Sequence, residues 1–500
     1  MFFVQNNFGQ DSTRSEAFRE NFSRRQPLIK AKYPSYSLIA GYLLVSEANR
    51  NDPFAQHELG IRYLLGNGFN ADTVKAIYWI RKAVDQNLPA ARFNYGIMLF
   101  NGIGVPWNPF EAFQNFKGAA VLGLAEAQLA LGLIYTDNLT VSRNLNESYR
   151  YLKLAAQAKN KDAQIALEQL LKSGFIPSLQ SDSLNIQPNK VADESSNLMN
   201  TNWELDYFDF ENSDKTNELN NEEFIKNLIE KDKVELKKYL GISEFADSSN
   251  ITDTTSIGLI KYAAEIGSPE ALLIIGRCYE LGYLFKKDLV QSSISYLRAY
   301  RLGSFKAGES LFKMSQNPSF ISILQKGVKD NFSEAKFIYS ALAALGFNNQ
   351  ITSEQALALL QSAAKANHIP SLIEMGLLHS LGTIVPKDRE KAIENWTIAS
   401  DLGSKEAHIR MALLKLTDSS NQKNLEEINT LFQLADEGAV LAQTALGYCY
   451  ENGIGVDENK AQAVKYYRNA AQRGNQTAFH SLKKIYDDLR PDNDLFRIYD

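Results

Sequence analysis

The residue types that most often carry out chemistry are scarce in this chain. It has five histidines, and no two of them form the H-E-x-x-H pattern that places two metal ligands on one helical face. An isolated histidine in a helix is more often a satisfied, partly buried core residue than a ligand. The chain also lacks a G-x-x-x-x-G-K-[ST] phosphate loop and a G-x-S-x-G nucleophile elbow. We therefore predict no enzyme, no catalytic residue, no metal site and no cofactor.

The two cysteines, Cys278 and Cys449, occupy one equivalent position in two copies of a repeated pattern. Other copies have aliphatic residues there, namely Met98, Ile134, Leu378 and Leu414. Both cysteines are therefore predicted to be small buried hydrophobic residues rather than reactive thiols. Two cysteines are too few for a disulfide framework or a cysteine-built zinc site, and they favour a reducing compartment.

Two loops with the sequence Asn-Gly-Ile-Gly-Val, at residues 101–105 and 452–456, are the nearest approach to a phosphate-binding motif. A phosphate loop needs a preceding strand and a lysine, and neither accompanies these loops. Both loops lie at the same place in a repeated unit. We interpret them as turns between helices, and the elements that they join define the architecture.

The repeated unit has a length of 36 residues, as the blocks that begin at Pro53, Pro89 and Ala125 show. Related blocks begin at Pro269, Ser333, Ile369, Lys405 and Val440, and another begins at Phe305. The blocks at Lys405 and Phe305 are shorter than 36 residues. A period in this range is typical of a solenoid of helix pairs. Each block is predicted to form a first helix, a short loop and a second helix.

A glycine recurs inside the predicted first helix, at Gly60, Gly96, Gly132, Gly276, Gly376 and Gly447. Glycine within a helix costs about 1 kcal/mol relative to alanine. Its recurrence on one face therefore predicts a packing notch, where two helices approach too closely for a side chain. A second recurring glycine, such as Gly66 or Gly453, is predicted to end the first helix with a positive φ.

The pattern A-x-x-x-L-G-x-x-Y-x-x-G-x-G-V, followed by a helix that ends in A-A-x-x-G, resembles the Sel1-like repeat, a branch of the tetratricopeptide-repeat superfamily. The match is clearest at residues 440–475 and 89–124. Two departures stand out, because residues 136–142 replace the glycine loop and Ala412 stands at a notch position. The resemblance implies an all-α solenoid of stacked antiparallel helix pairs, about 23 helices in all.

The array is interrupted once. We predict a polar segment at residues 1–33, a repeat lobe at 34–174, an acidic insert rich in asparagine and serine at 175–221, a second repeat lobe with a capping helix at 222–490, and a tail at 491–500. A long polar insert of this kind is typical of disordered or functional loops. The unit that begins at Lys161 is either split by the insert or followed by a separate unit, and the sequence leaves both open.

The insert contains an acidic aromatic run with Trp203, Tyr207, Phe208 and Phe210. These side chains could dock in a groove of a partner or on this protein's own repeats. We favour docking on self, because the flanking repeats hold a groove at high local concentration.

Recognition is predicted at variable positions of the first helices, since stacked repeats present these helices on a concave face that binds proteins or peptides. The candidate partner-binding residues there are His57, Glu58, Arg62, Phe93, Asn94, Arg277, Glu374 and Arg410. The alternative is that they are ordinary solvated helix positions.

The family resemblance implies a non-catalytic adaptor or scaffold for a protein or peptide partner. With 53 basic and 58 acidic residues, the chain has no basic excess that would favour nucleic acid. We expect no membrane insertion and a cytoplasmic location, since no long apolar run or signal peptide is visible. Two alternatives remain open: an envelope or secretion-system assembly factor, which cell fractionation would reveal, and an enzyme or small-ligand binder with an interhelical pocket near His57 or His379.

Overall fold

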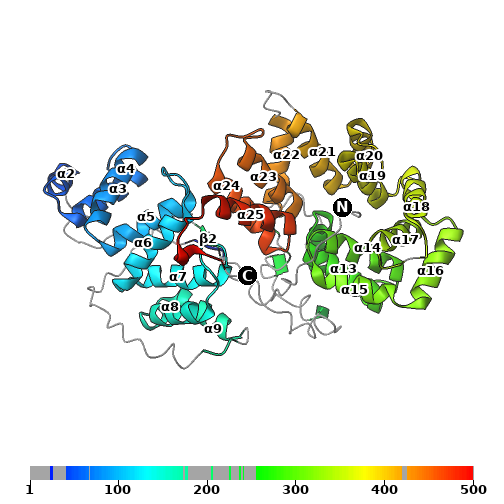
Figure 1. Ribbon diagram of the computed structural model, residues 1–500, viewed down its shortest axis with the longest axis horizontal. Helices are drawn as coiled ribbons and strands as arrows, with labels where there is room; N and C mark the ends of the chain where they lie inside the picture. Colours follow the sequence, from blue (N-terminus) through cyan, green and yellow to red (C-terminus); the bar gives the residue numbers. More distant parts are fainter. Residues whose placement is uncertain are drawn as a thin grey trace. The chain divides into compact units, whose positions relative to one another are not determined.

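The computed structural model describes residues 23–25, 41–66, 68–172, 175–177, 204–206, 225–226, 233, 236–237, 240, 242, 255–348, 350–418 and 425–498. Within these residues the chain forms 22 α-helices, and two strands of three residues each (Figure 1). Each consecutive helix pair of the repeat register packs together as an antiparallel hairpin. The prediction of an all-α solenoid is confirmed.

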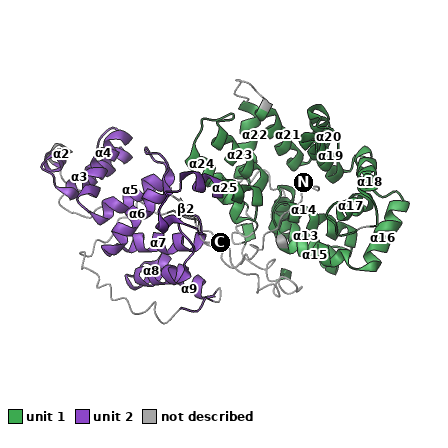
Figure 2. Cartoon of the chain, in the orientation of Figure 1, with its two compact units in different colours: residues 1–12, 214–481 green, residues 13–213, 482–500 purple. Residues whose placement is uncertain are grey.

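The chain divides into two compact units (Figure 2). Unit 1 comprises residues 1–12 and 214–481, and unit 2 comprises residues 13–213 and 482–500. The division falls inside the last helix, α25 (Gln476–Leu489). Residues 482–490, which we assigned to the C-terminal lobe from the sequence, therefore cluster with unit 2.

Unit 2 holds the first helix pairs of the chain. Its helices are α2 (Gly41–Asn49), α3 (Pro53–Leu65), α4 (Thr73–Asp85), α5 (Pro89–Asn101), α6 (Pro109–Val121), α7 (Ala125–Asp137), α8 (Leu145–Gln157) and α9 (Lys161–Lys172), with a short 3-10 helix, η5 (Asp494–Phe496). Strand β1 (Ser23–Arg25) pairs antiparallel with β2 (Glu204–Asp206), so that Arg24 lies opposite Leu205. Part of the acidic insert thus pairs with the N-terminal segment.

Unit 1 holds the second series of helices. They are α12 (Ser256–Glu265), α13 (Pro269–Leu281), α14 (Leu289–Arg301), α15 (Phe305–Ser315), α16 (Pro318–Lys329), α17 (Ser333–Ala344), α18 (Ser353–Lys365), α19 (Ile369–Leu381), α20 (Arg389–Asp401), α21 (Lys405–Asp418), α22 (Leu425–Asp436), α23 (Val440–Asn452) and α24 (Lys460–Gln472). The shortened block at Phe305 is the pair α15 and α16.

The ends of the helices are encoded locally. The first helices of five pairs end at a glycine in the left-handed region, for example Gly102 with φ of 65° and Gly453 with φ of 66°. Most of the second helices begin after an aspartate or asparagine whose side chain accepts a hydrogen bond from the backbone of the first turn, as Asn108 and Asn459 do, and α18 begins after Thr352 in the same way. These caps satisfy backbone groups that a helix end leaves unpaired. The predicted helix stop at the glycines is confirmed.

The recurring glycine inside the first helix is a packing notch, as predicted. A Cβ added at Gly447 would lie 2.5 Å from the ring of Tyr467, and one at Gly96 would lie 2.6 Å from the ring of Phe116. In each pair the large side chain comes from the second helix of the same hairpin and is fully buried. The two helices therefore approach at the distance that glycine permits.

We expect Gly447→Ala to lower the free energy of unfolding by up to about 2 kcal/mol, because overpacking costs about 1–3 kcal/mol and alanine returns about 1 kcal/mol of helix propensity. Denaturant titration measures the loss. The control is the same change in a Tyr467→Leu background, where the ring that would clash is absent. The loss should be smaller there, and an equal loss in both backgrounds would contradict the notch.

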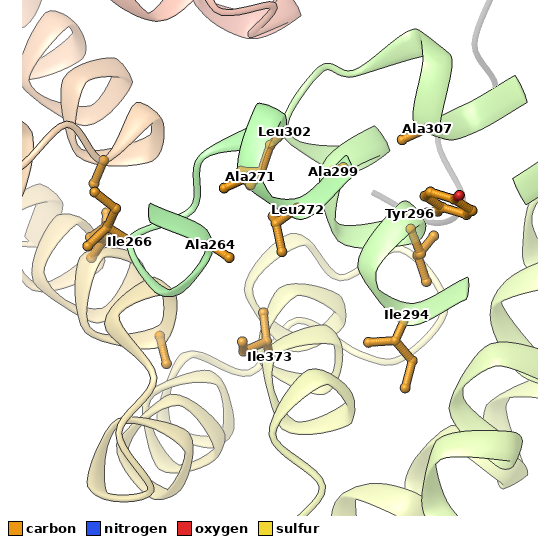
Figure 3. Close-up of a cluster of buried hydrophobic side chains, with 14 of the residues drawn as sticks. Ala264, Ile266, Ala271, Leu272, Ile294, Tyr296, Ala299, Leu302, Ala307 and Ile373 are labelled. Carbon is orange, nitrogen blue, oxygen red and sulfur yellow. The ribbon is translucent and has the colours of Figure 1, made fainter. Parts of the chain in front are cut away.

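The core of unit 1 is one continuous cluster of buried apolar side chains. Figure 3 shows Leu272 of α13 and Ile373 of α19 pointing toward one another, so helices that are far apart in the sequence share this core. Cys278 and Cys449 are buried within it as free thiols. Burial raises the pKa of each thiol to about 12, and both cysteines are core residues, as predicted.

In the part of the chain that the structure describes, no helix is long and apolar enough to cross a membrane. The same residues contain no group of three or more histidine, cysteine, aspartate or glutamate side chains arranged to hold a metal ion.

Candidate interaction surface

Three of the predicted partner-binding residues of unit 2 lie in its interior. His57 of α3 and Asn94 of α5 are fully buried, and the Nε2 of His57 lies 2.8 Å from the amide nitrogen of Asn94. Burial lowers the pKa of His57 to about 4, so its imidazole is neutral at pH 7. Phe93 is also fully buried and packs on Phe116, with ring centroids 5.6 Å apart. These side chains join neighbouring helices and are not on the exposed surface of unit 2.

Glu58 and Arg62 keep some contact with solvent. The Nε of Arg62 donates to a carboxylate oxygen of Glu58 at 2.8 Å, one helical turn away. Both side chains are mostly buried. The pair holds the guanidinium in a defined orientation on α3, where a partner could reach its edge.

Arg277 of α13 forms a similar pair in unit 1. Its guanidinium lies 2.7 Å from Glu280, and the hydroxyl of Tyr296 donates to the same carboxylate at 2.5 Å. The hydrogen bond from a tyrosine hydroxyl to a glutamate recurs in the last hairpin, where Tyr467 donates to Glu451 at 2.7 Å. The tyrosine that fills the notch thus also anchors a carboxylate near the end of the first helix.

A larger group of charges gathers in unit 1. We call it the charge cluster, and its members are Arg298 and Arg301 of α14, Glu374 of α19, and Glu406 and Arg410 of α21. Arg301 forms an ion pair with Glu374, which is fully buried. Arg410 donates through Nε and Nη2 to one oxygen of Glu406, at 3.1 and 2.8 Å. Helices from three different hairpins therefore contribute to one polar site.

The two carboxylates of the charge cluster have opposite pKa shifts. Burial raises the pKa of Glu374, against the opposing charges of Arg301 and Arg410. Burial also acts to raise the pKa of Glu406, but the guanidiniums of Arg410, Arg301 and Arg298 outweigh it and lower the pKa to about 2. Glu406 is therefore ionised throughout the physiological range.

Further ion pairs join the two ends of the unit 1 array. Lys405 lies 2.8 Å from Glu437, and its ammonium is 4.8 Å from the ring centre of Tyr262 on α12. Arg473, just beyond α24, lies 3.1 Å from Glu270 on α13. The end of α24 is thus in contact with the start of α13, and the start of α21 with α12.

The structure brings Glu374 and Arg410 together, and it places Arg277 in a separate pair. Sequence reasoning missed Arg298, Arg301 and Glu406. The two arginines lie on the second helix of a hairpin. The other copies of the repeat have different residue types at these positions, as is typical of solvent-exposed positions, so no signal in the sequence marked them. Trp203, Tyr207, Phe208 and Phe210 lie outside the described residues, and their role in docking stays a prediction.

Comparison with known proteins supports the repeat assignment. Six segments match the model of the Sel1 repeat, at residues 53–88, 89–123, 125–160, 353–368, 369–404 and 440–475. The hairpins α13–α14 and α21–α22 lie outside these segments, yet they form at the places that the repeat register predicts.

Several curated proteins match over part of the chain. A mouse protein, DAP3-binding cell death enhancer 1, is 31% identical over 110 residues, which are 22% of this chain and 21% of that protein. The chitin synthase regulator SKT5 of Saccharomyces cerevisiae is 24% identical over 251 residues, 45% of this chain and 35% of the regulator. Human protein sel-1 homolog 2 is 34% identical over 151 residues, 29% of this chain and 22% of that protein. The chain thus spans only a fifth to about a third of the length of these relatives.

Two solved structures of bacterial proteins align with most of this chain. A protective antigen of uropathogenic Escherichia coli with an SLR fold, c5321, aligns with 90% of this chain and 83% of its own, at 21% identity and a TM-score of 0.31. A repeat protein from Oxalobacter formigenes aligns with 97% of this chain and 96% of its own, at 18% identity and a TM-score of 0.25.

Proposed function

Because this chain is a Sel1-repeat protein, we propose that it is a non-catalytic adaptor that binds a partner protein or peptide on the concave face of its helical array. The observation that carries the proposal is the charge cluster of unit 1. Four of its five side chains, all except Glu374, keep some contact with solvent. They include three arginines, whose planar guanidiniums suit recognition of carboxylates and backbone carbonyls.

Stacking of the repeats does not explain these charges. The notch glycines, the alanines and the buried tyrosines form the shared packing surface, whereas the charge cluster consists of other side chains of α14, α19 and α21. A buried ion pair adds little stability over well-packed apolar residues of the same volume, because desolvation opposes the attraction. A role in specific recognition accounts for charges at this site.

The names of the matched relatives are consistent with such a role. One is described as DAP3-binding and another as a regulator of chitin synthase, and both descriptions refer to action on another protein. The proposal transfers only this general class to the present chain. We place its action in the cytoplasm, and we propose Glu58 and Arg62 of unit 2 and Arg277 of unit 1 as further contacts.

The adaptor proposal predicts that Arg410→Ala weakens binding of the partner at least tenfold, a change of about 1.4 kcal/mol. The partner would first be obtained by affinity capture on the full chain and then purified for calorimetric titration. Lys415→Ala is the matched control, since it removes one positive charge from the same helix at a more exposed site, where Lys415 lies 3.6 Å from Glu427.

Thermal melting of both variants checks that the array stays folded. Unchanged affinity of a folded Arg410→Ala variant would contradict the proposed binding face. An equal loss of affinity in the Lys415→Ala variant would also contradict it, because the removal of any positive charge from α21 would then weaken binding.

A further inference from the structure

The C-terminal segment of the chain packs on the loop between α5 and α6, on α6 and on the loop after α7, all within unit 2. Tyr486 of α25 is fully buried, and its ring lies 5.0 Å from that of Trp107. Phe496 of η5 is only 3% exposed, with its ring 5.0 Å from Phe110 and 5.9 Å from Phe113. Two aromatic side chains ten residues apart therefore anchor this segment in an aromatic surface.

An arginine between the two anchors makes the polar contacts. The guanidinium of Arg490 donates to the carbonyl oxygens of Leu139 at 2.8 Å and Thr140 at 3.3 Å, and it lies 5.3 Å from the ring centre of Phe110. It also donates to the carbonyl of Phe496 at 2.7 Å, which closes the segment between them into a loop. We call residues 490–497 the C-terminal hook.

The surface that receives the hook is specific to this part of the array. We call it the hook site. Its members are Phe110, Phe113, Leu139, Thr140 and Ser142, which contact the hook, together with Trp107, which contacts Tyr486 just before it. Ser142 donates to the carbonyl of Arg497 at 2.7 Å. Residues 139–142 belong to the loop that departs from the glycine pattern of the other repeats, and the hook gives this departure a structural reason.

The aromatic residues of the hook site also depart from the repeat. The position of Trp107 is taken by exposed charged residues in other units, Lys287, Lys387 and Glu458. The position of Phe110 is taken by exposed Glu390 in one unit. Stacking therefore does not require a large aromatic side chain at these two positions.

The contacts of the hook with the hook site come from Arg490, Phe496 and Arg497. Residues 491–494, between Arg490 and Phe496, are exposed, so opening the hook would uncover little apolar surface apart from the rings of Phe496, Phe110 and Phe113. Segments with few buried apolar contacts open locally at low free energy without unfolding of the core. A segment of the same chemistry could then take the place of the hook.

We propose that the hook site is a second peptide-binding site of this protein, selective for an arginine followed six residues later by a phenylalanine. The chain's own hook is its resident ligand, and a partner protein carrying the same pattern displaces it. The carbonyls of Leu139 and Thr140 select the guanidinium, and the rings of Phe110 and Phe113 select the phenyl group. The site is independent of the charge cluster.

The test uses a fluorescent peptide with the sequence of residues 487–498, DDLRPDNDLFRI, and fluorescence anisotropy. The full-length Phe496→Ala variant should bind this peptide at least tenfold more tightly than the wild-type chain, because the resident ligand no longer competes. The same peptide with alanine in place of the arginine that corresponds to Arg490 should bind at least tenfold more weakly. Asp488→Ala, at an exposed position of α25, should leave the affinity of the chain unchanged.

Equal affinity of the wild-type chain and the Phe496→Ala variant would overturn the proposal, as would equal binding of the alanine-substituted peptide. A self-associated Phe496→Ala variant in sedimentation would assign the site to a second copy and overturn the choice of a partner protein. A photoreactive phenylalanine analogue in the peptide gives a second measurement on wild-type protein. Crosslinks should map to α6, and crosslinks elsewhere or none would contradict the site.

Discussion

Gly303→Ala is expected to destabilise unit 1 by about 3–5 kcal/mol, and the same change at Gly403 by about 1–2 kcal/mol. Both glycines follow a second helix in the sequence Leu-Gly-Ser, and both have a positive φ, 112° and 94°. Alanine is strained at either position. Only at Gly303 would the new Cβ meet another backbone, since it would lie 1.8 Å from the carbonyl oxygen of Gly474, whereas no atom lies within 4 Å at Gly403.

The comparison tests the contact between the two ends of the unit 1 array. Gly474 follows α24, and the adjacent Arg473 pairs with Glu270 at the start of α13. Guanidinium chloride titration of both variants gives the two losses of stability. Because the backbone conformation is shared, their difference measures the close approach alone. Equal losses would show that the end of α14 and the end of α24 are not in contact in solution.

Glu406→Gln is expected to lower the free energy of unfolding at pH 7 by about 3 kcal/mol, because one pKa unit corresponds to about 1.4 kcal/mol. The folded-state pKa of Glu406 is about 2, against an ordinary value of 4.5. The folded state therefore holds the proton less tightly than the unfolded chain. The contribution of the carboxylate is complete above the unfolded pKa and is lost as the pH falls from 4.5 toward 2.

The measurement is the difference in unfolding free energy between wild type and Glu406→Gln at pH 7, 4 and 3. That difference should shrink across the series. Glu394→Gln, an exposed change on α20, is the control and should stay close to wild type at each pH. A difference for Glu406→Gln that does not vary with pH would mean that the arginines of the charge cluster do not stabilise the ionised carboxylate.

The helix pairs could be predicted from the sequence because their signals are local. The alternation of Gly102 with Asn108, or of Gly453 with Asn459, fixes where one helix stops and the next begins through backbone conformation and capping. The notch at Gly447 was also visible, since its partner Tyr467 lies a constant distance along the same hairpin.

The candidate site was only partly predictable. His57 and Phe93 stand at variable positions, and the sequence suggested a surface role for them, but the neighbouring helices bury both. Variation between copies marks a position that stacking does not fix, and it does not report whether the side chain faces solvent. Arg298 and Arg301 illustrate the reverse case, because ordinary-looking helix positions became part of the charge cluster.

What the sequence determined by itself is the unit and its repetition: the two helices, the turn between them, their caps and the close approach at the notch glycine. These depend on interactions within about 40 residues, which recur in each copy. Only the tertiary structure decided which charges meet and which segment covers the hook site. Glu374 and Arg301 are separated by two hairpins, and Arg490 by most of the chain from Leu139. Such contacts depend on the small rotation between successive hairpins, which accumulates along the array. The sequence pattern of a single hairpin does not predict this accumulated rotation.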